Sequence, residues 1–229
     1  MERWYHKIMD PLNYLHLQMR LEGKEIFNEC LIRQVEAVPD EELPLTLIAQ
    51  LAGGALVTYY DESMSPDLQK ELAACLRDTE FPNIDALLNI LRIHTTEFET
   101  GHYKTYVFAS TPSSTFDVRC LSKKDPRVKE FGFDSLAESV YAIERDGKLV
   151  SACVSTRENE TCGEAWVFTA PEYRHQGLAQ KVVSAWAGSL MSASKVPFYS
   201  HKIDNVASAN LARLLKLQPV FEEISITRA

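Results

Sequence analysis

Hydrophobic positions in the first half of the 229-residue chain recur mostly at helical spacing. Within residues 11–36 the apolar side chains follow the helical period, at Leu12, Leu15, Met19, Ile26, Phe27 and Leu31. We expect a helix here that Gly23 interrupts. A second apolar segment, residues 43–51, predicts another helix that ends before Gly53 and Gly54.

Two strands and two further helices complete this half of the chain. The strands are predicted at 55–60 and 103–109, and the helices at 65–77 and 83–93. Ser65 and Pro66 are typical of an N-cap and a first helical residue, and Asn83 is placed to cap the next helix. We therefore expect a mainly helical N-terminal domain over residues 1–110, whose role the sequence does not reveal.

The second half has a different order of elements. A Ser/Thr/Pro stretch at 110–115 is typical of a linker, and strand patterns then alternate with helices. The predicted strands are 116–121, 139–144, 149–156, 163–169, 197–202 and 220–226. The predicted helices are one that begins at Pro126 and those at 133–138, 178–193 and 207–217. Asp146 and Gly147 indicate a hairpin. This order predicts an α/β (α+β) fold with a mixed, mostly antiparallel sheet flanked by helices.

The segment after the strand at 163–169 is suited to hold a phosphate. Pro171 ends the strand pattern, a short loop follows over 174–179, and an amphipathic helix comes next. The start of a helix leaves backbone N–H groups free, and its dipole favours negative charge. Gly177 allows close backbone approach, and Arg174 can add a charge-assisted bond. The alternative interpretation is an ordinary strand–helix turn with an exposed arginine.

This loop resembles the acetyl-CoA loop of the GNAT N-acetyltransferase superfamily, with the pattern Arg/Gln-x-x-Gly-x-Gly/Ala. Arg174, Gly177 and Ala179 fill its three fixed positions. The order of predicted elements over residues 116–229 also matches the GNAT fold. The resemblance therefore implies an acetyl-CoA-binding catalytic domain over 116–229.

The resemblance also implies residues that contact the coenzyme. They are Phe168, Thr169, Arg174, His175, Gln176, Gly177, Leu178, Ala179, Asn205 and Ser208. The strand at 163–169 is expected to part from the next strand and to grip the pantetheine arm. A backbone N–H near Phe168 or Thr169 would then polarise the thioester carbonyl. Asn205 can also cap the last helix, and the two roles are compatible.

Glu164 is the candidate general base, because acetylation needs a neutral amine and a carboxylate can relay its proton. The alternative is a solvated glutamate, or one paired with a nearby Lys or Arg. Trp166 and Phe168 share a strand face with Glu164 and either line the acceptor pocket or are buried packing.

The departing thiolate needs a proton donor. Many family members use a Tyr in the last helix, and that position is Ala212 in this chain. His201 and Ser208 are the candidate catalytic substitutes, with Tyr199 a further option. His201 can titrate near neutral pH, although a polar strand-end histidine is the simpler interpretation.

Charge and cysteine content narrow the class of protein. The net charge is −8, which disfavours general nucleic-acid binding; residues 1–110 carry 9 basic and 18 acidic side chains, residues 111–229 carry 15 and 14. The five cysteines are scattered, without Cys-x-x-Cys spacing, so we expect reduced, mostly buried thiols, no metal site and a cytoplasmic protein. Neither a membrane span nor a secretory signal is predicted.

These observations lead to an N-acetyltransferase that moves an acetyl group from acetyl-CoA to a primary amine by direct attack in a ternary complex. The acceptor is a small amine or a peptide amine whose identity stays open, as does the oligomeric state, with a homodimer as one option. The alternative is a non-catalytic acyl-CoA-binding regulatory or interaction module. Ala212 and the degenerate Leu215-Lys216-Leu217 ending support that alternative.

Overall fold

A computed structural model describes residues 9–36, 42–77, 80–94, 97–112, 117–133 and 138–228. The chain forms two compact units. The loop unit contains Thr105–Pro219, together with Met9 and Asp10, and includes the predicted phosphate loop. The N-terminal unit contains Pro11–Lys104 and the residues that follow Pro219. The predicted domains, 1–110 and 116–229, stay predictions, and the last strand belongs mainly with the N-terminal unit.

The N-terminal unit combines a sheet with three helices. Its helices are α1 (Pro11–Leu21), α2 (Pro66–Arg77) and α3 (Asp85–His94). Its strands are β1 (Lys24–Phe27), β2 (Leu31–Gln34), β3 (Thr46–Leu51), β4 (Leu56–Asp61), β5 (Phe98–Val107) and β11 (Gln218–Arg228), in the order β1-β2-β4-β3-β11-β5. The mainly helical domain expected from the sequence is therefore not confirmed.

Two helix predictions in this unit are wrong. The predicted helix over 11–36 is correct as far as Leu21, and Gly23, with a φ of 72°, interrupts it as expected. The helix predicted beyond Gly23 is wrong, because the chain forms the hairpin β1–β2 there. The predicted helix over 43–51 is strand β3. This strand is buried on both faces, so its apolar residues form a continuous run whose spacing does not separate a strand from a helix.

The other starts predicted in this unit are confirmed. Ser65 Oγ accepts a hydrogen bond from the N–H of Leu68 at 3.3 Å at the start of α2. Asn83 Oδ1 accepts one from the N–H of Asp85 at 3.1 Å at the start of α3. The predicted strands at 55–60 and 103–109 correspond to β4 and to the end of the longer β5.

The loop unit follows the predicted order of elements. Its strands are β6 (Arg119–Ser122), β7 (Ser139–Arg145), β8 (Lys148–Glu158), β9 (Cys162–Thr169) and β10 (Val196–Lys202), in the order β10-β9-β8-β7-β6. Its helices are α4 (Pro126–Glu130), the 3-10 turn η1 (Pro171–Tyr173), α5 (Leu178–Ser192) and α6 (Val206–Leu214). Most of the predicted helix at 133–138, the start of the strand at 116–121 and part of the linker lie outside the described residues.

Helices cover both faces of this sheet. The predicted apolar face of α5 is buried in a core cluster, with Leu178, Val182, Val183, Trp186 and Leu190. Cys153 of β8 belongs to that cluster, whereas its neighbours Ala152 and Val154 pack with Val128 of α4. Because successive strand residues point to opposite faces, α5 and α4 lie on opposite sides of β8.

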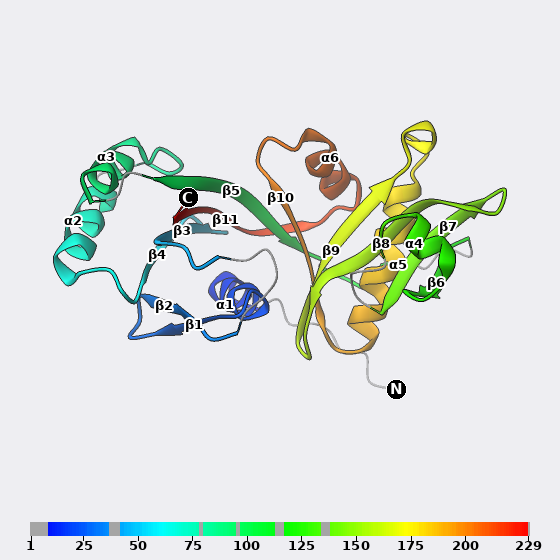
Figure 1. Ribbon diagram of the computed structural model, residues 1–229, viewed down its shortest axis with the longest axis horizontal. Coiled ribbons are helices and arrows are strands. Elements are labelled where there is room, and N and C mark those ends of the chain that lie inside the picture. The colour runs from blue at the N-terminus through cyan, green and yellow to red at the C-terminus, as the bar shows by residue number, and fades with distance from the viewer. Residues whose placement is uncertain are drawn as a thin grey trace. The chain divides into compact units, whose positions relative to one another are not determined.

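Strands β9 and β10 part after a short paired stretch. They pair in parallel only from Val196 opposite Cys162 to Phe198 opposite Glu164, as far as the described residues show. Beyond that point Figure 1 shows β9 and β10 running apart. This confirms the parting of strands that the GNAT resemblance implies, and it leaves one edge of β9 open beyond Glu164.

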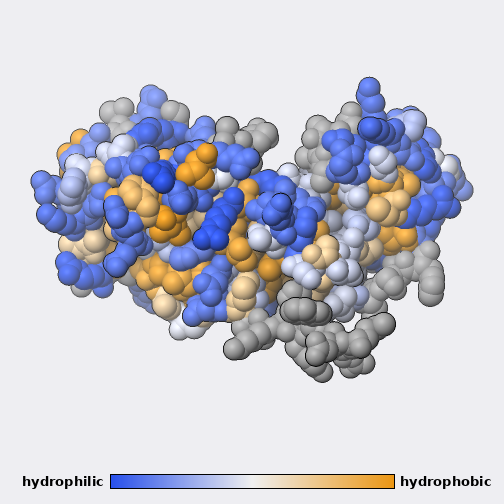
Figure 2. All heavy atoms as spheres, turned by 90° about the horizontal axis from the view of Figure 1, so that it is seen from below, coloured by the Kyte–Doolittle hydropathy of each residue, from blue (hydrophilic) through white to orange (hydrophobic). Residues whose placement is uncertain are grey.

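The face of the molecule in Figure 2 is largely hydrophilic, and the cysteines, all of which the structure describes, form no disulfides. On the face drawn in Figure 2, hydrophobic residues occur as patches within a largely hydrophilic surface. All five cysteines are free thiols, but only Cys153 and Cys162 are buried, so the expectation of mostly buried thiols is wrong. Within the described ranges, no helix is both long and apolar enough to cross a bilayer.

Candidate functional site

The predicted phosphate loop is a tight turn between β9 and α5. The N–H of Tyr173 donates to Ala170 O at 2.9 Å, and the N–H of Arg174 donates to Pro171 O at 3.3 Å. His175 and Gly177 then adopt left-handed backbone conformations, with φ of 62° and 73°. These two residues turn the chain so that α5 begins directly after the loop.

The N-terminus of α5 has no side-chain cap. Gly177 occupies the N-cap position, and the first hydrogen bond of the helix runs from the N–H of Lys181 to Gly177 O at 3.4 Å. The N–H groups of Leu178 and Ala179 therefore have no acceptor within the helix. A Cβ added at Gly177 would meet nothing nearer than Gln180 Oε1, at 3.6 Å. No atom of the described residues therefore crowds the Cβ side of Gly177.

The side chains of the loop are exposed. Arg174, His175 and Gln176 all face solvent, which confirms the exposed His175 expected from the sequence. Arg174 Nε donates to Thr169 O at 3.2 Å, and this hydrogen bond ties its guanidinium to the last residue of β9. Lys181, one turn into α5, is paired with Asp117 at 2.7 Å.

The open edge of β9 presents alternate backbone amides. The N–H of Ala170 donates to Val150 O of β8 at 2.9 Å. Amide directions alternate along a strand, so the N–H of Phe168 also points to β8, while those of Thr169 and Val167 point to the edge that β10 has left. Of the two predicted carbonyl donors, Thr169 has the N–H on the open edge.

Glu164 is a buried, paired carboxylate. It is 5% exposed, and Arg157 Nε donates to its Oε2 at 3.1 Å, with a second, shorter contact from Arg157 Nη2. Arg157 lies directly across the β8–β9 hairpin from Glu164. Sequence reasoning anticipated an ion pair as an alternative but did not name Arg157, although counting back through the hairpin would have found it.

Trp166 and Phe168 lie on the same side of β9 as Glu164 but are far more exposed. They contact Phe133 and Phe131, with ring centroids 4.4 Å and 5.5 Å apart. The alternative interpretation of these two residues as buried packing is wrong. Phe131 and Phe133 were not among the predicted site residues, because nothing in their spacing relates them to β9.

A second group of predicted residues gathers on β10 and α6. Asn205 caps α6, with its Oδ1 accepting from the N–H of Ser208 at 3.0 Å. Tyr199 OH donates to Ser208 O at 3.4 Å, and burial raises the pKa of Tyr199 to about 12. Ala212, at the position of the family's tyrosine, is buried in the core cluster.

His201 is buried and only partly satisfied. Its ring is 6% exposed and stacks on Tyr106, with centroids 5.5 Å apart. Nδ1 lies 2.8 Å from Lys202 O, whereas Nε2 has no hydrogen-bond partner among the described residues. His201 lies at the end of β10, as the simpler interpretation of a strand-end histidine expects, but it is buried. Tyr106, which sequence reasoning missed, lies on β5, far away in the chain.

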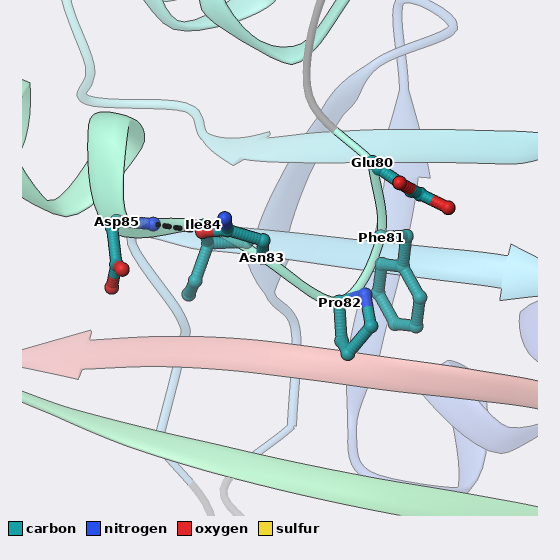
Figure 3. A pocket seen from close by; sticks show the side chains of 6 residues that line it. All are labelled: Glu80, Phe81, Pro82, Asn83, Ile84 and Asp85. Carbon is teal, nitrogen blue, oxygen red and sulfur yellow. Dashed lines mark hydrogen bonds between the residues drawn. The ribbon is translucent and has the colours of Figure 1, made fainter.

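A separate hollow lies in the N-terminal unit. Six consecutive residues, Glu80 to Asp85, line a volume of about 540 Å³ (Figure 3). The only hydrogen bond drawn there is the helix cap from Asp85 N–H to Asn83 Oδ1. No cluster of three or more potential metal ligands occurs in the described part of the chain. The loop unit therefore holds the stronger candidate site.

Residues 140–222 match the model of the GNAT acetyltransferase family. This segment contains β9, the loop, α5 and Asn205, and it confirms the resemblance noted in the sequence. The match supports a transferase that moves an acyl group from acyl-CoA. A comparison with curated proteins finds no match.

Several solved structures are similar at low identity. An acetyltransferase of the GNAT family from Colwellia psychrerythraea is 10% identical, with a TM-score of 0.49, over 76% of this chain and 77% of that one. A GCN5-related N-acetyltransferase-like protein from Streptococcus suis is 13% identical, with a TM-score of 0.47, over 98% and 96%. A protein assigned to the GNAT family from Novosphingobium aromaticivorans is 16% identical, with a TM-score of 0.49, over 57% and 66%. The similarity to the GNAT acetyltransferase family therefore rests on the match of residues 140–222.

Proposed function

We propose that the protein is an N-acetyltransferase that moves an acetyl group from acetyl-CoA to a primary amine, by direct attack of the amine in a ternary complex. One observation carries this proposal: an uncapped helix N-terminus follows a strand whose edge is open. A Cβ at Gly177 would meet nothing closer than 3.6 Å, so no atom in the described part of the chain crowds this position against an approaching ligand. The acceptor is a small amine or a peptide amine, and the five free thiols favour the cytoplasm.

The loop would hold the diphosphate through its main chain. The N–H groups of Gln176, Gly177, Leu178 and Ala179 donate to phosphate oxygens, where the helix dipole favours negative charge. Arg174 adds charge, and His175 lies beside it at the exposed rim. Asn205 and Ser208 at the start of α6 complete the coenzyme contacts, since capping uses only the Oδ1 atom of Asn205.

The open edge of β9 would orient the reacting carbonyl. Acetyl-CoA supplies the acetyl group as an activated thioester. The N–H of Thr169, or that of Val167, hydrogen bonds the carbonyl oxygen, where negative charge develops as the amine attacks. The N–H of Phe168 points to β8, so Phe168 contributes to the coenzyme site through its side chain. The C–N bond forms, the C–S bond breaks, the amine loses a proton, and the leaving thiolate gains one.

Glu164 is proposed as the base and either His201 or Ser208 as the acid. The ion pair with Arg157 fixes the orientation of the Glu164 carboxylate, so that it can accept a proton through a water. His201 is buried with Nε2 unpartnered among the described residues, and its Nδ1 donates to Lys202 O. Nε2 can therefore give a proton to the thiolate only from the doubly protonated ring, because the neutral ring carries its single proton on Nδ1. Tyr199 is the alternative donor.

Two observations favour a second candidate, the non-catalytic acyl-CoA-binding module. Ala212 replaces the family's tyrosine, and Arg157 occupies the carboxylate of Glu164. Such a module would bind acyl-CoA with the same loop but would not catalyse acyl transfer. The two candidates therefore share the coenzyme site and differ in the residues around the thioester.

Thiol release from acetyl-CoA across a panel of primary amines separates the two candidates. We expect Glu164→Gln to lower kcat about 100-fold or more while the Kd for CoA stays unchanged. The matched control is Glu158→Gln, another paired carboxylate at the same hairpin, bonded to Lys195 at 2.7 Å. CoA binding without turnover of any amine would establish the module. Equal kcat in the two variants would remove Glu164 from the mechanism.

A further inference from the structure

Four aromatic rings form a contiguous cluster beside β9, which we call the aromatic shelf: Phe131, Phe133, Trp166 and Phe168. Phe133 contacts Trp166 with centroids 4.4 Å apart, and Phe131 contacts Phe168 at 5.5 Å. Phe131 and Phe133 are 5.3 Å apart and nearly perpendicular, at 68°. Each ring therefore contacts another member of the cluster, and the spacings are those of favourable aromatic pairs.

The shelf has a buried support and an exposed face. Phe133 is 1% exposed and packs with Val128 and Val154 in the core between α4 and the sheet. Trp166 is 44% exposed and Phe168 is 40% exposed. A large aromatic pair left open on a firmly packed base is unusual for a surface and is typical of a ligand site.

The opposite face of β9 is already filled. Ala165 and Val167, which alternate with the two exposed rings, pack against the core cluster of α5. An apolar ligand group at this strand therefore has room only on the shelf side. The shelf also continues into the proposed reaction centre, because Glu164 shares its strand face and Thr169 follows Phe168 directly.

We propose that the shelf binds the body of the acceptor, and that the acceptor is a primary amine carrying an aromatic ring. This inference rests on the proposed N-acetyltransferase function. A ring laid on Trp166 and Phe168 gains stacking as well as apolar contact, whereas an aliphatic chain gains the contact alone. A short linker between ring and nitrogen places the amine along β9, near Glu164.

Kinetics with three amines test the inference on the full-length protein: 2-phenylethylamine, 2-cyclohexylethylamine and ethanolamine. We expect the wild type to use them in that order of kcat/KM. Trp166→Ala and Phe168→Ala should each lower kcat/KM for 2-phenylethylamine about tenfold, from lost stacking and apolar contact. The loss of kcat/KM for ethanolamine should be several-fold smaller in both variants, because ethanolamine has no ring to place on the shelf. Trp166→Phe, which keeps a ring, should restore most of the loss.

The matched control is Leu214→Ala, an apolar residue of α6 that is 52% exposed and lies outside the shelf. It should leave the preference among the three amines unchanged. Loss of activity in equal proportion for all three amines in the shelf variants would show that the rings only support the fold. Preference for ethanolamine in the wild type would overturn the assignment of an aromatic acceptor.

A binding measurement distinguishes failure of the shelf from failure of the enzyme. Quenching of tryptophan fluorescence by 2-phenylethylamine, measured with CoA present, should disappear in Trp166→Phe. If no amine is acetylated but this quenching is found, the shelf stands and the transferase proposal fails. If ethanolamine is acetylated and 2-phenylethylamine neither quenches nor reacts faster, the transferase stands and the shelf proposal fails.

Discussion

The start of α5 differs from the starts of α4 and α6 in the same unit. Asp125 caps α4, accepting from the N–H of Arg127 at 3.0 Å, and hydrogen bonds from Arg127 lower the pKa of Asp125 to about 2. Asn205 caps α6 in the same manner. Helix α5 has only Gly177 at this position. The difference teaches that a side-chain cap satisfies a backbone donor that no described side chain satisfies at the start of α5.

Packing allows α5 to do without a cap. With glycine at the N-cap, the missing side-chain cap costs only a few tenths of a kcal/mol. Helix α5 buries seven side chains against the sheet: Leu178, Val182, Val183, Trp186, Ala187, Leu190 and Met191. Helix α6 buries only Ala212. The helix with the most burial can leave its first amides free, whereas α6 depends more on its local contacts.

Gly177→Glu is expected to have the largest effect of the variants that test the uncapped start of α5. Its carboxylate would occupy the anion position of the uncapped helix, and CoA affinity should fall on the order of 100-fold through the loss of charge-assisted bonds. Isothermal titration calorimetry with CoA measures this loss. The fold should stay intact, because a side chain at this position has open space and the strain of a left-handed glutamate costs only about 1–2 kcal/mol.

Gly147→Glu is the matched control for that substitution. Gly147 has a similar φ, 80° against 73°, and also has open space for a Cβ, but it lies in the β7–β8 hairpin. It therefore reproduces the backbone strain and the added charge without touching the loop. Equal affinities of the two variants for CoA would contradict the role of the loop amides.

Tyr199→Phe tests a contact that supports the start of α6, the hydrogen bond from Tyr199 OH to Ser208 O. Burial raises the pKa of Tyr199 to about 12 from a usual value of 10.0. Its contribution to stability is complete below pH 10 and is lost as the pH rises towards 12, because only the unfolded state ionises in that range. The free energy of unfolding of the wild type should fall relative to the variant by on the order of 2 kcal/mol across this window.

Urea unfolding at pH 8, 10 and 12 measures this change. Tyr60→Phe is a useful companion, since burial also raises the pKa of Tyr60 to about 12 in the N-terminal unit. A constant difference between the wild type and Tyr199→Phe at all three pH values would show that the phenol ionises as freely in the folded protein as in the unfolded chain.

Asn205→Ala is expected to have the smallest effect. Removing this cap should lower the free energy of unfolding by about 1 kcal/mol, whereas Asn205→Ser should restore most of it. If the amide of Asn205 also contacts the coenzyme, both variants should bind CoA more weakly. Thermal unfolding and calorimetry together separate the roles. Unchanged CoA affinity in both would leave Asn205 as a cap alone.

The loop unit could be predicted from the sequence because its signals are local. Asp125 with Pro126, Asp146 with Gly147, and Gly177 before an amphipathic helix each determine a turn or a cap within a few residues. The order of the predicted strands and helices then predicted a mixed, mostly antiparallel sheet flanked by helices. The parting of β9 and β10 came from the family resemblance, since no residue pattern encodes an unpaired edge.

The failures share a physical cause, which is contact between distant segments. Strand β3 is apolar on both faces because it is central in its sheet, and that position depends on β11. The burial of His201 depends on Tyr106 of β5, and the aromatic shelf joins the end of α4 to β9. Local spacing carries no information on such partners.

The place of β11 has a consequence for biosynthesis. This strand lies between β3 and β5 in the sheet of the N-terminal unit, yet it is made only after the whole loop unit. Until β11 is synthesised, the edges of β3 and β5 that pair with it in the folded protein have no partner strand. Unpaired strand edges are prone to wrong pairing. The half of the chain that leaves the ribosome first is thus the one that completes its folding last.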